Sequence, residues 1–171
     1  MHIHDPRQVV FTYLLHSSRQ ADNVALPDTI YILREHRIAQ RIFFIVTYTT
    51  QYQQQIYASI IVRQTEVGMW DFAGFFLMGG ASVADSSEQL SPQIAYIVSA
   101  RQNYSFIGVV VLPNKMQITS LAFRDTHGIV FEDQLENGTV LFVTNQLLQH
   151  PIDVELYDHA HLLINQQHIF H

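Results

Sequence analysis

The chain has 171 residues, of which 48% are hydrophobic and 14% charged, and its net charge is −6 with histidine neutral. This balance excludes an intrinsically disordered chain, and the length is sufficient to bury a core without covalent cross-links. The absence of cysteine excludes disulfides, thiolate metal sites and a cysteine nucleophile.

The first patterned segment, residues 4–18, predicts a helix. Asp5 is a suitable N-cap residue, and Pro6 fits the first helical position. Val10 and Tyr13 are spaced three residues apart, so they fall on one apolar helix face.

The chain start lacks an apolar core behind a basic stretch, so we expect no signal peptide. We therefore expect a cytoplasmic protein, or an extracytoplasmic one if a leader has been removed.

Four segments rich in β-branched and aromatic residues come next, and short polar breaks separate them. They are residues 29–35, 41–51, 54–64 and 69–79. This pattern predicts an antiparallel meander. A helix over residues 31–44 is the alternative, because Arg34, Arg37 and Arg41 would then share one face. The β-branched and aromatic flanks favour strands.

Residues 79–92 are small and polar and are bounded by Gly and Pro, which is typical of a linker. Seven further strand-like segments follow, at residues 93–100, 105–112, 116–123, 128–135, 139–145, 152–158 and 161–170. Asn137-Gly138 predicts a two-residue type I′ hairpin turn, which needs positive φ at both positions. Ile118 is out of phase with Leu121 for a flat strand, so we expect a bulge near Thr119-Ser120.

These elements predict an α+β fold that is mostly β. An N-terminal helix packs on a four-strand antiparallel meander, and a small β-sandwich follows it. The expected domain bounds are residues 1–80 for the helix and sheet, 81–92 for the linker and 93–171 for the sandwich.

The order of these elements resembles small uncharacterised bacterial proteins that are exported or lipid-anchored. The motif that carries the resemblance in the second half falls on Tyr104, Gly108, Pro113, Ile118, Asp125 and Gly128. The resemblance implies a cystatin-like N-terminal part, a C-terminal β-sandwich and an export history. It implies no catalytic residue.

Two similar stretches, residues 121–131 and 154–164, are each interrupted at an aspartate. The first reads Asp-Thr-His-Gly from Asp125, and the second reads Asp-His-Ala-His from Asp158. We favour a turn in both, since an aspartate can accept hydrogen bonds from backbone N–H groups two residues on. In the second turn His161 takes the place of glycine, because histidine is among the residues enriched at positive φ.

A metal site is the alternative for the second stretch. Residues i and i+2 of a strand project to the same side, so His159 and His161 could hold one ion. Asp158, Glu155 or His168 could complete the site. Without cysteine or a third fixed ligand, the pair is a weak signal.

The space between the helix and the meander is a candidate ligand site. Val10, Tyr13, Trp70 and Phe72 would line it. An ordinary hydrophobic core is the reading that we favour for these four residues.

Charge is unevenly distributed along the chain. Residues 1–124 hold nine basic and eight acidic residues, whereas residues 125–171 hold seven acidic residues, six histidines and neither Lys nor Arg. Such a surface repels phosphate backbones, so we predict no nucleic-acid partner.

The longest apolar stretch, residues 72–81, is about half the length of a membrane helix, so we predict no integral membrane segment.

No residue set has catalytic spacing, so the sequence favours a non-catalytic binding or interaction module rather than an enzyme. We expect no cofactor, and either an unknown protein partner or a small ligand. Loops and hairpin tips on a rigid β scaffold would present the contact surface. Two alternatives stay open: a small-ligand carrier, and a metal-binding protein that uses the His159/His161 hairpin.

Overall fold

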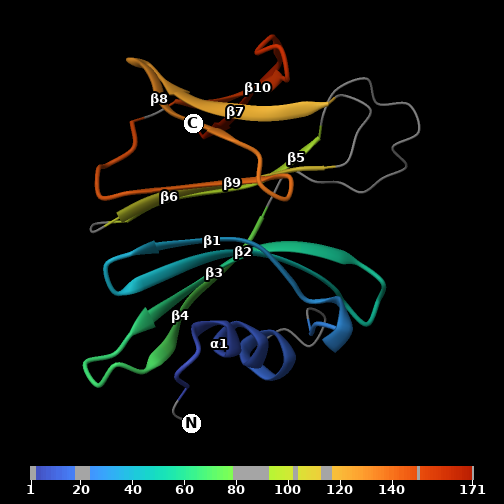
Figure 1. The fold of residues 1–171 in the computed structure, drawn as a ribbon, viewed down its shortest axis with the longest axis vertical. Helices are drawn as coiled ribbons and strands as arrows, with labels where there is room; N and C mark the ends of the chain where they lie inside the picture. Colours follow the sequence, from blue (N-terminus) through green and yellow to red (C-terminus); the bar gives the residue numbers. More distant parts are fainter. Residues whose placement is uncertain are drawn as a thin grey trace. The chain divides into compact units, whose positions relative to one another are not determined.

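The computed structural model describes residues 3–17, 24–78, 93–101, 104–112, 117–149 and 151–170. Contacts divide the chain into two compact units, Met1–Met78 and Gly79–His171. The linker predicted over residues 81–92 lies outside the described residues. The fold is mostly β with one short N-terminal helix, which confirms the predicted fold class (Figure 1).

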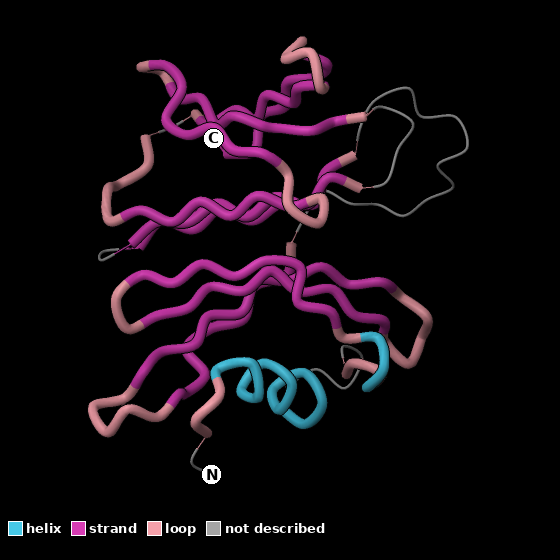
Figure 2. The backbone as a smooth tube through the Cα atoms, viewed as in Figure 1, coloured by secondary structure: helices cyan, strands magenta, loops and turns pink. Residues whose placement is uncertain are grey.

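The first unit places helix α1 against one face of a four-strand antiparallel sheet of order β1-β2-β3-β4 (Figures 1 and 2). Its elements are α1 (Pro6–Thr12), the π-helical turn Tyr13–Ser17, the short 3₁₀ helix Pro27–Thr29, β1 (Tyr31–Ile38), β2 (Arg41–Thr49), β3 (Gln55–Gln64) and β4 (Trp70–Leu77). The Asp5 side chain accepts a hydrogen bond from the Arg7 backbone N–H at 2.9 Å, as expected for the N-cap.

The alternative helix over residues 31–44 is wrong. β1 and β2 form a hairpin that turns at Ala39, which has a φ of 48°. Phe44 belongs to the core on the helix side, yet its neighbours Phe43 and Ile45 on β2 are also fully buried. Because both faces of β2 are buried, the strand has no polar alternation by which it could be distinguished from a helix.

The helix-side core contains a buried hydroxyl, that of Tyr48, which is 1% exposed. Among the residues that the structure describes, this hydroxyl has no hydrogen-bond partner. Burial, together with the nearby Tyr13, raises the pKa of Tyr48 to about 12.

Tyr48→Phe is therefore expected to leave the free energy of unfolding unchanged or to raise it by about 1 kcal/mol, because the variant removes an unsatisfied buried group. Urea unfolding followed by Trp70 fluorescence measures this change, since Trp70 lies in the same core. A loss of more than about 1 kcal/mol would mean that the hydroxyl has a polar partner in solution.

The second unit is a sandwich of two antiparallel sheets whose orders are β11-β10-β7-β8 and β5-β6-β9. Its strands are β5 (Ile94–Arg101), β6 (Tyr104–Val111), β7 (Ile118–Asp125), β8 (Gly128–Gln134), β9 (Thr139–Thr144), β10 (Ile152–Asp158) and β11 (Leu163–Phe170). One hydrophobic core includes Ile107 from the smaller sheet, and Phe123 and Leu156 from the larger sheet. All seven predicted strands are therefore present.

The turn predicted at Asn137-Gly138 is confirmed, but the prediction that its two flanking strands form a hairpin is wrong. The φ values are 50° at Asn137 and 71° at Gly138, as a type I′ turn requires. However, β8 pairs with β7 while β9 pairs with β6, and only a single bridge joins Glu136 to Thr139. The turn carries the chain from one sheet to the other instead of closing a ladder.

The predicted bulge in β7 is confirmed. Tyr157 of β10 pairs with Ser120 and Asp158 pairs with Ile118, so Thr119 is the extra residue. The bulge allows Ile118 to pack against the same core as Leu121.

Candidate functional site

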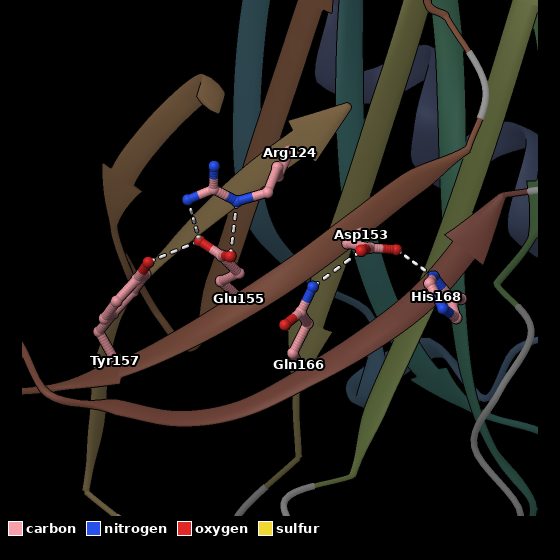
Figure 3. Close-up of polar contacts among 6 residues, drawn as sticks. All are labelled: Arg124, Asp153, Glu155, Tyr157, Gln166 and His168. Atoms are coloured by element: carbon pink, nitrogen blue, oxygen red, sulfur yellow. Dashed lines mark hydrogen bonds and ion pairs between the residues drawn. The ribbon is translucent and has the colours of Figure 1, made fainter. Parts of the chain in front are cut away.

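The candidate site lies on the face of sheet β11-β10-β7-β8 that points away from the core. On β10, Val154 and Leu156 belong to the core. Because side chains alternate along a strand, Asp153, Glu155 and Tyr157 project to the opposite face. Figure 3 shows these three residues with the polar side chains that they contact on the neighbouring strands.

Glu155 forms the centre of the first polar group. Its carboxylate accepts hydrogen bonds from Arg124 Nε at 2.7 Å and from Arg124 Nη2 at 3.2 Å. It also accepts one from the Tyr157 hydroxyl at 2.6 Å (Figure 3). The Glu155 side chain is 7% exposed and that of Arg124 is 39% exposed. A carboxylate is therefore buried on the outer face and held in a two-point ion pair.

These contacts shift the pKa values of Glu155 and Tyr157 in opposite directions. The hydrogen bonds from Arg124 lower the pKa of Glu155, and burial opposes them only in part. The pKa of Tyr157 is raised, chiefly because its hydroxyl donates to the Glu155 carboxylate. Glu155 is therefore held in its charged form, and Tyr157 in its protonated form.

This lowered pKa predicts acid sensitivity. A carboxyl with a depressed pKa in the folded state contributes stability above its unfolded pKa and loses it as the pH falls through the folded value. Glu155→Gln is thus expected to have a lower free energy of unfolding than the wild type at pH 7. This difference in free energy should become smaller from about pH 5 downward. Urea midpoints at pH 7, 5 and 4 measure the gap, and a constant gap would contradict the prediction.

Asp153 forms the centre of the second polar group. Its carboxylate accepts a hydrogen bond from Gln166 Nε2 at 2.8 Å and contacts the ring nitrogen Nδ1 of His168 (Figure 3). Both partners lie on β11, whereas Arg124 lies on β7. The two groups together link three neighbouring strands through their outer side chains.

The second aspartate stretch is a turn, as predicted. Asp158 Oδ1 accepts hydrogen bonds from the backbone N–H groups of Ala160 at 2.8 Å and Leu162 at 3.0 Å. These backbone hydrogen bonds, that from Leu162 first, lower the pKa of Asp158. His161 has a φ of 59° and so occupies the left-handed position predicted for it. The first stretch has the matching turn, in which Asp125 Oδ1 accepts from the His127 N–H at 2.7 Å.

His161 also makes contacts that the turn alone does not require. Its ring stacks on that of Tyr157 with centroids 4.6 Å apart and 7° between the planes. Its Nδ1 lies 3.6 Å from Oε1 of Glu132 on β8. The imidazole therefore extends from the β10–β11 turn over the outer face of the sheet, which the sequence did not predict.

Two variants separate the backbone and side-chain roles of His161. Alanine keeps the strain of positive φ and loses the ring, whereas glycine loses the ring but relieves the strain. His161→Gly is therefore expected to be more stable than His161→Ala by about 1 kcal/mol. Chemical unfolding of both variants measures this difference, and equal stabilities would mean that the turn relaxes.

The structure places the three predicted metal ligands in different surroundings. His159 is exposed in the turn, His161 stacks on Tyr157, and His168 pairs with Asp153 on β10. Over the part of the chain that the structure describes, no group of three or more His, Cys, Asp or Glu residues is placed to hold a metal ion.

The structure places the four predicted ligand-site residues in the helix-side core or next to it. Val10 is fully buried and Trp70 is 7% exposed, both in the helix-side core. Tyr13 stacks on Phe72 with ring centroids 4.0 Å apart, and Phe72 remains 38% exposed. The Arg37 guanidinium lies 5.3 Å from the centre of the Trp70 ring.

One feature of the site was not singled out from the sequence. Leu162, Leu163 and Ile164 are consecutive, and they are 62%, 52% and 36% exposed. Tyr157 pairs with Leu163 while Leu156 pairs with Asn165, so Ile164 is the extra residue of a bulge. The bulge and the adjoining turn place all three side chains outside the core; we call these three residues the hairpin surface. In the sequence, three consecutive apolar residues directly after a turn could have indicated this exposed group.

No helix within the described ranges is both long and apolar enough to span a membrane. Comparisons with protein-family models, with curated proteins and with solved structures find no match to this chain.

Proposed function

We propose that the protein is a non-catalytic binding module that contacts a protein partner through the hairpin surface. The observation that carries this proposal is the exposure of Leu162, Leu163 and Ile164 in succession. Single exposed apolar residues are ordinary, but a contiguous exposed group is typical of an interaction site.

The hairpin surface is held in place before any partner arrives. The Asp158 carboxylate fixes the turn through two backbone N–H groups. The ring of His161 is stacked on Tyr157, whose hydroxyl is bonded to buried Glu155. A contact surface ordered in advance loses less conformational entropy on binding, which favours affinity.

Site-specific photo-crosslinking tests the proposal. A benzophenone amino acid is placed at Leu163, and at Val67 as the matched control, in cells that express the protein from its own gene. Val67 is 77% exposed and lies in the β3–β4 turn of the other unit. We expect a discrete adduct with one protein from position 163 and none from position 67. Equal adducts from both positions, or none from position 163, would refute the proposal.

A small-ligand carrier is the second candidate. It is favoured by the Tyr48 hydroxyl, which is buried and has no hydrogen-bond partner within the described part of the chain. A ligand bound between the helix and the sheet could form a hydrogen bond with this hydroxyl through one polar atom. Such a bond would remove the free-energy cost of a buried hydroxyl that has no hydrogen bond. Native mass spectrometry of untagged protein is the test. A retained mass above 19.7 kDa that Tyr48→Phe abolishes would support the carrier, and the bare mass alone would contradict it.

A further inference from the structure

We infer that the hairpin surface binds its partner in a pH-dependent way, because protonation of His161 holds its ring against Tyr157 and Glu132 and so fixes the turn that presents the surface. This inference rests on the proposed function and concerns the regulation of that same site. Three observations lead to it: the position of the ring, the charges around it and the backbone that joins it to Leu162.

The His161 ring touches two groups that attract a positive charge. Its centroid lies 4.6 Å from that of the Tyr157 ring, with 7° between the planes. A cation at such a distance over an aromatic ring is attracted to the ring face. On β8, Glu132 Oε1 lies 3.6 Å from Nδ1 of the same imidazole. A carboxylate attracts an imidazolium, and a neutral imidazole loses this attraction.

The charges on the elements around this ring are mainly negative. Among the described residues, the titratable and charged groups that face it from its own turn and from the neighbouring strands are Glu132, Asp158, Glu155, Tyr157, Arg124 and His159. Arg124 and Glu155 offset each other in their ion pair. The carboxylates of Glu132 and Asp158 remain, and of the six groups only His159 adds positive charge when it is protonated.

Histidine is the side chain that can change this balance. Residues 125–171 contain neither Lys nor Arg, so only histidine side chains can carry a positive charge in this segment. A histidine side chain changes its charge between about pH 5 and 8. Backbone hydrogen bonds lower the pKa of Asp158, and those from Arg124 lower that of Glu155, so both carboxylates stay charged over this range. Acidification from pH 8 to 5.5 therefore adds the attraction of the His161 ring to its two neighbours.

The backbone of the turn connects the ring to the hairpin surface. His161 donates its N–H to the carbonyl oxygen of Asp158 at 3.0 Å. The next residue, Leu162, donates its N–H to the Asp158 carboxylate at 3.0 Å, and its carbonyl oxygen accepts from the Asp158 N–H at 3.1 Å. The ring and the apolar side chains thus belong to one turn.

The ring can leave its position without opening the core, because the His161 side chain is 63% exposed. A ring held against Tyr157 and Glu132 ties the turn to β10 and β8, whereas a released ring leaves the turn with its local hydrogen bonds alone. A surface that is ordered before binding loses less conformational entropy, so the charged form of His161 favours the partner.

Selection from a displayed library of decapeptides tests the inference with the full chain as the target. The library contains no Asp, Glu, His, Lys or Arg, so the charge of the peptides does not change with pH. Selection is done at pH 5.5 and at pH 8, and the peptides that Leu163→Ser binds roughly tenfold more weakly are kept. They are synthesised with blocked ends, and fluorescence anisotropy measures their affinity. We expect binding about threefold tighter at pH 5.5 than at pH 8, as for an exposed ion pair.

Three variants assign this pH dependence. His161→Asn removes the titrating ring and keeps a residue type that tolerates positive φ, so it should bind equally at both pH values. Glu132→Gln removes the facing charge and should reduce the ratio to less than about twofold. His127→Gln is the matched control: His127 is 71% exposed and lies in the corresponding aspartate turn, so the threefold ratio should persist. All three side chains are exposed, and circular dichroism should report wild-type folding at both pH values.

The outcomes distinguish the inference from the proposed function. Peptides that depend on Leu163 but bind equally at both pH values, or more tightly at pH 8, would overturn the inference and leave the proposed function standing. A pH dependence that persists in His161→Asn would also overturn the inference, because another group would then cause it. If no peptide depends on Leu163 at either pH, both are wrong.

Discussion

Replacing Arg124 by alanine is expected to lower the melting temperature by roughly 5–10 °C. The variant leaves the Glu155 carboxylate, which is 7% exposed, with Tyr157 as its one remaining partner in the group. A buried charge that has lost its ion-pair partner retains its desolvation cost without the compensating attraction. Thermal unfolding followed by far-ultraviolet circular dichroism at pH 7 measures the effect.

Arg7→Ala is the matched control for that measurement. Arg7 donates to Glu35 at 2.9 Å, but the two side chains are 58% and 46% exposed. An exposed ion pair contributes little, so the melting temperature should change by less than about 2 °C. Equal shifts for the two alanine variants would mean that burial does not set the importance of the Arg124–Glu155 pair.

Phe123→Ala is expected to lower the free energy of unfolding of the second unit by about 3–5 kcal/mol. Phe123 is fully buried, and its ring centroid lies 5.9 Å from that of Phe131 and 6.2 Å from that of Phe142. The three rings come from β7, β8 and β9, so they join the two sheets of the sandwich. Removing the fully buried Phe123 ring creates a cavity in the sandwich core that the surrounding side chains fill only in part.

Two optical signals make this experiment specific. Circular dichroism follows both units, whereas the fluorescence of Trp70 reports on the first unit alone. Phe72→Ala is the control, because Phe72 is 38% exposed and should cost about 1 kcal/mol. A loss below about 2 kcal/mol for Phe123→Ala would show that the sandwich core collapses around the missing ring.

Much of the local structure could be predicted from the sequence, because it depends on residues close together along the chain. The Asp5 cap needs only the next residues, and the turn after Asp158 needs only the N–H groups of Ala160 and Leu162. The positive φ at His161 follows from the same turn. Strand patterns likewise depend on alternation within each segment.

The candidate site depended on residues far apart in the sequence. Arg124 and Glu155 are 31 positions apart, and they meet only because β7 and β10 are neighbours in the sheet. The contact between His161 and Glu132 needs the further pairing of β7 with β8. No spacing rule along one chain predicts such contacts, because strand order is decided by which apolar faces can be buried together.

The sequence by itself thus determined the strands, the helix cap and the two aspartate turns, since backbone preferences and short-range hydrogen bonds act over a few residues. The tertiary structure decided that the Asn137-Gly138 turn crosses between sheets and that Glu155 is buried on an outer face. It also decided that Leu162, Leu163 and Ile164 are exposed together, because the bulge at Ile164 forms only when β11 pairs with β10.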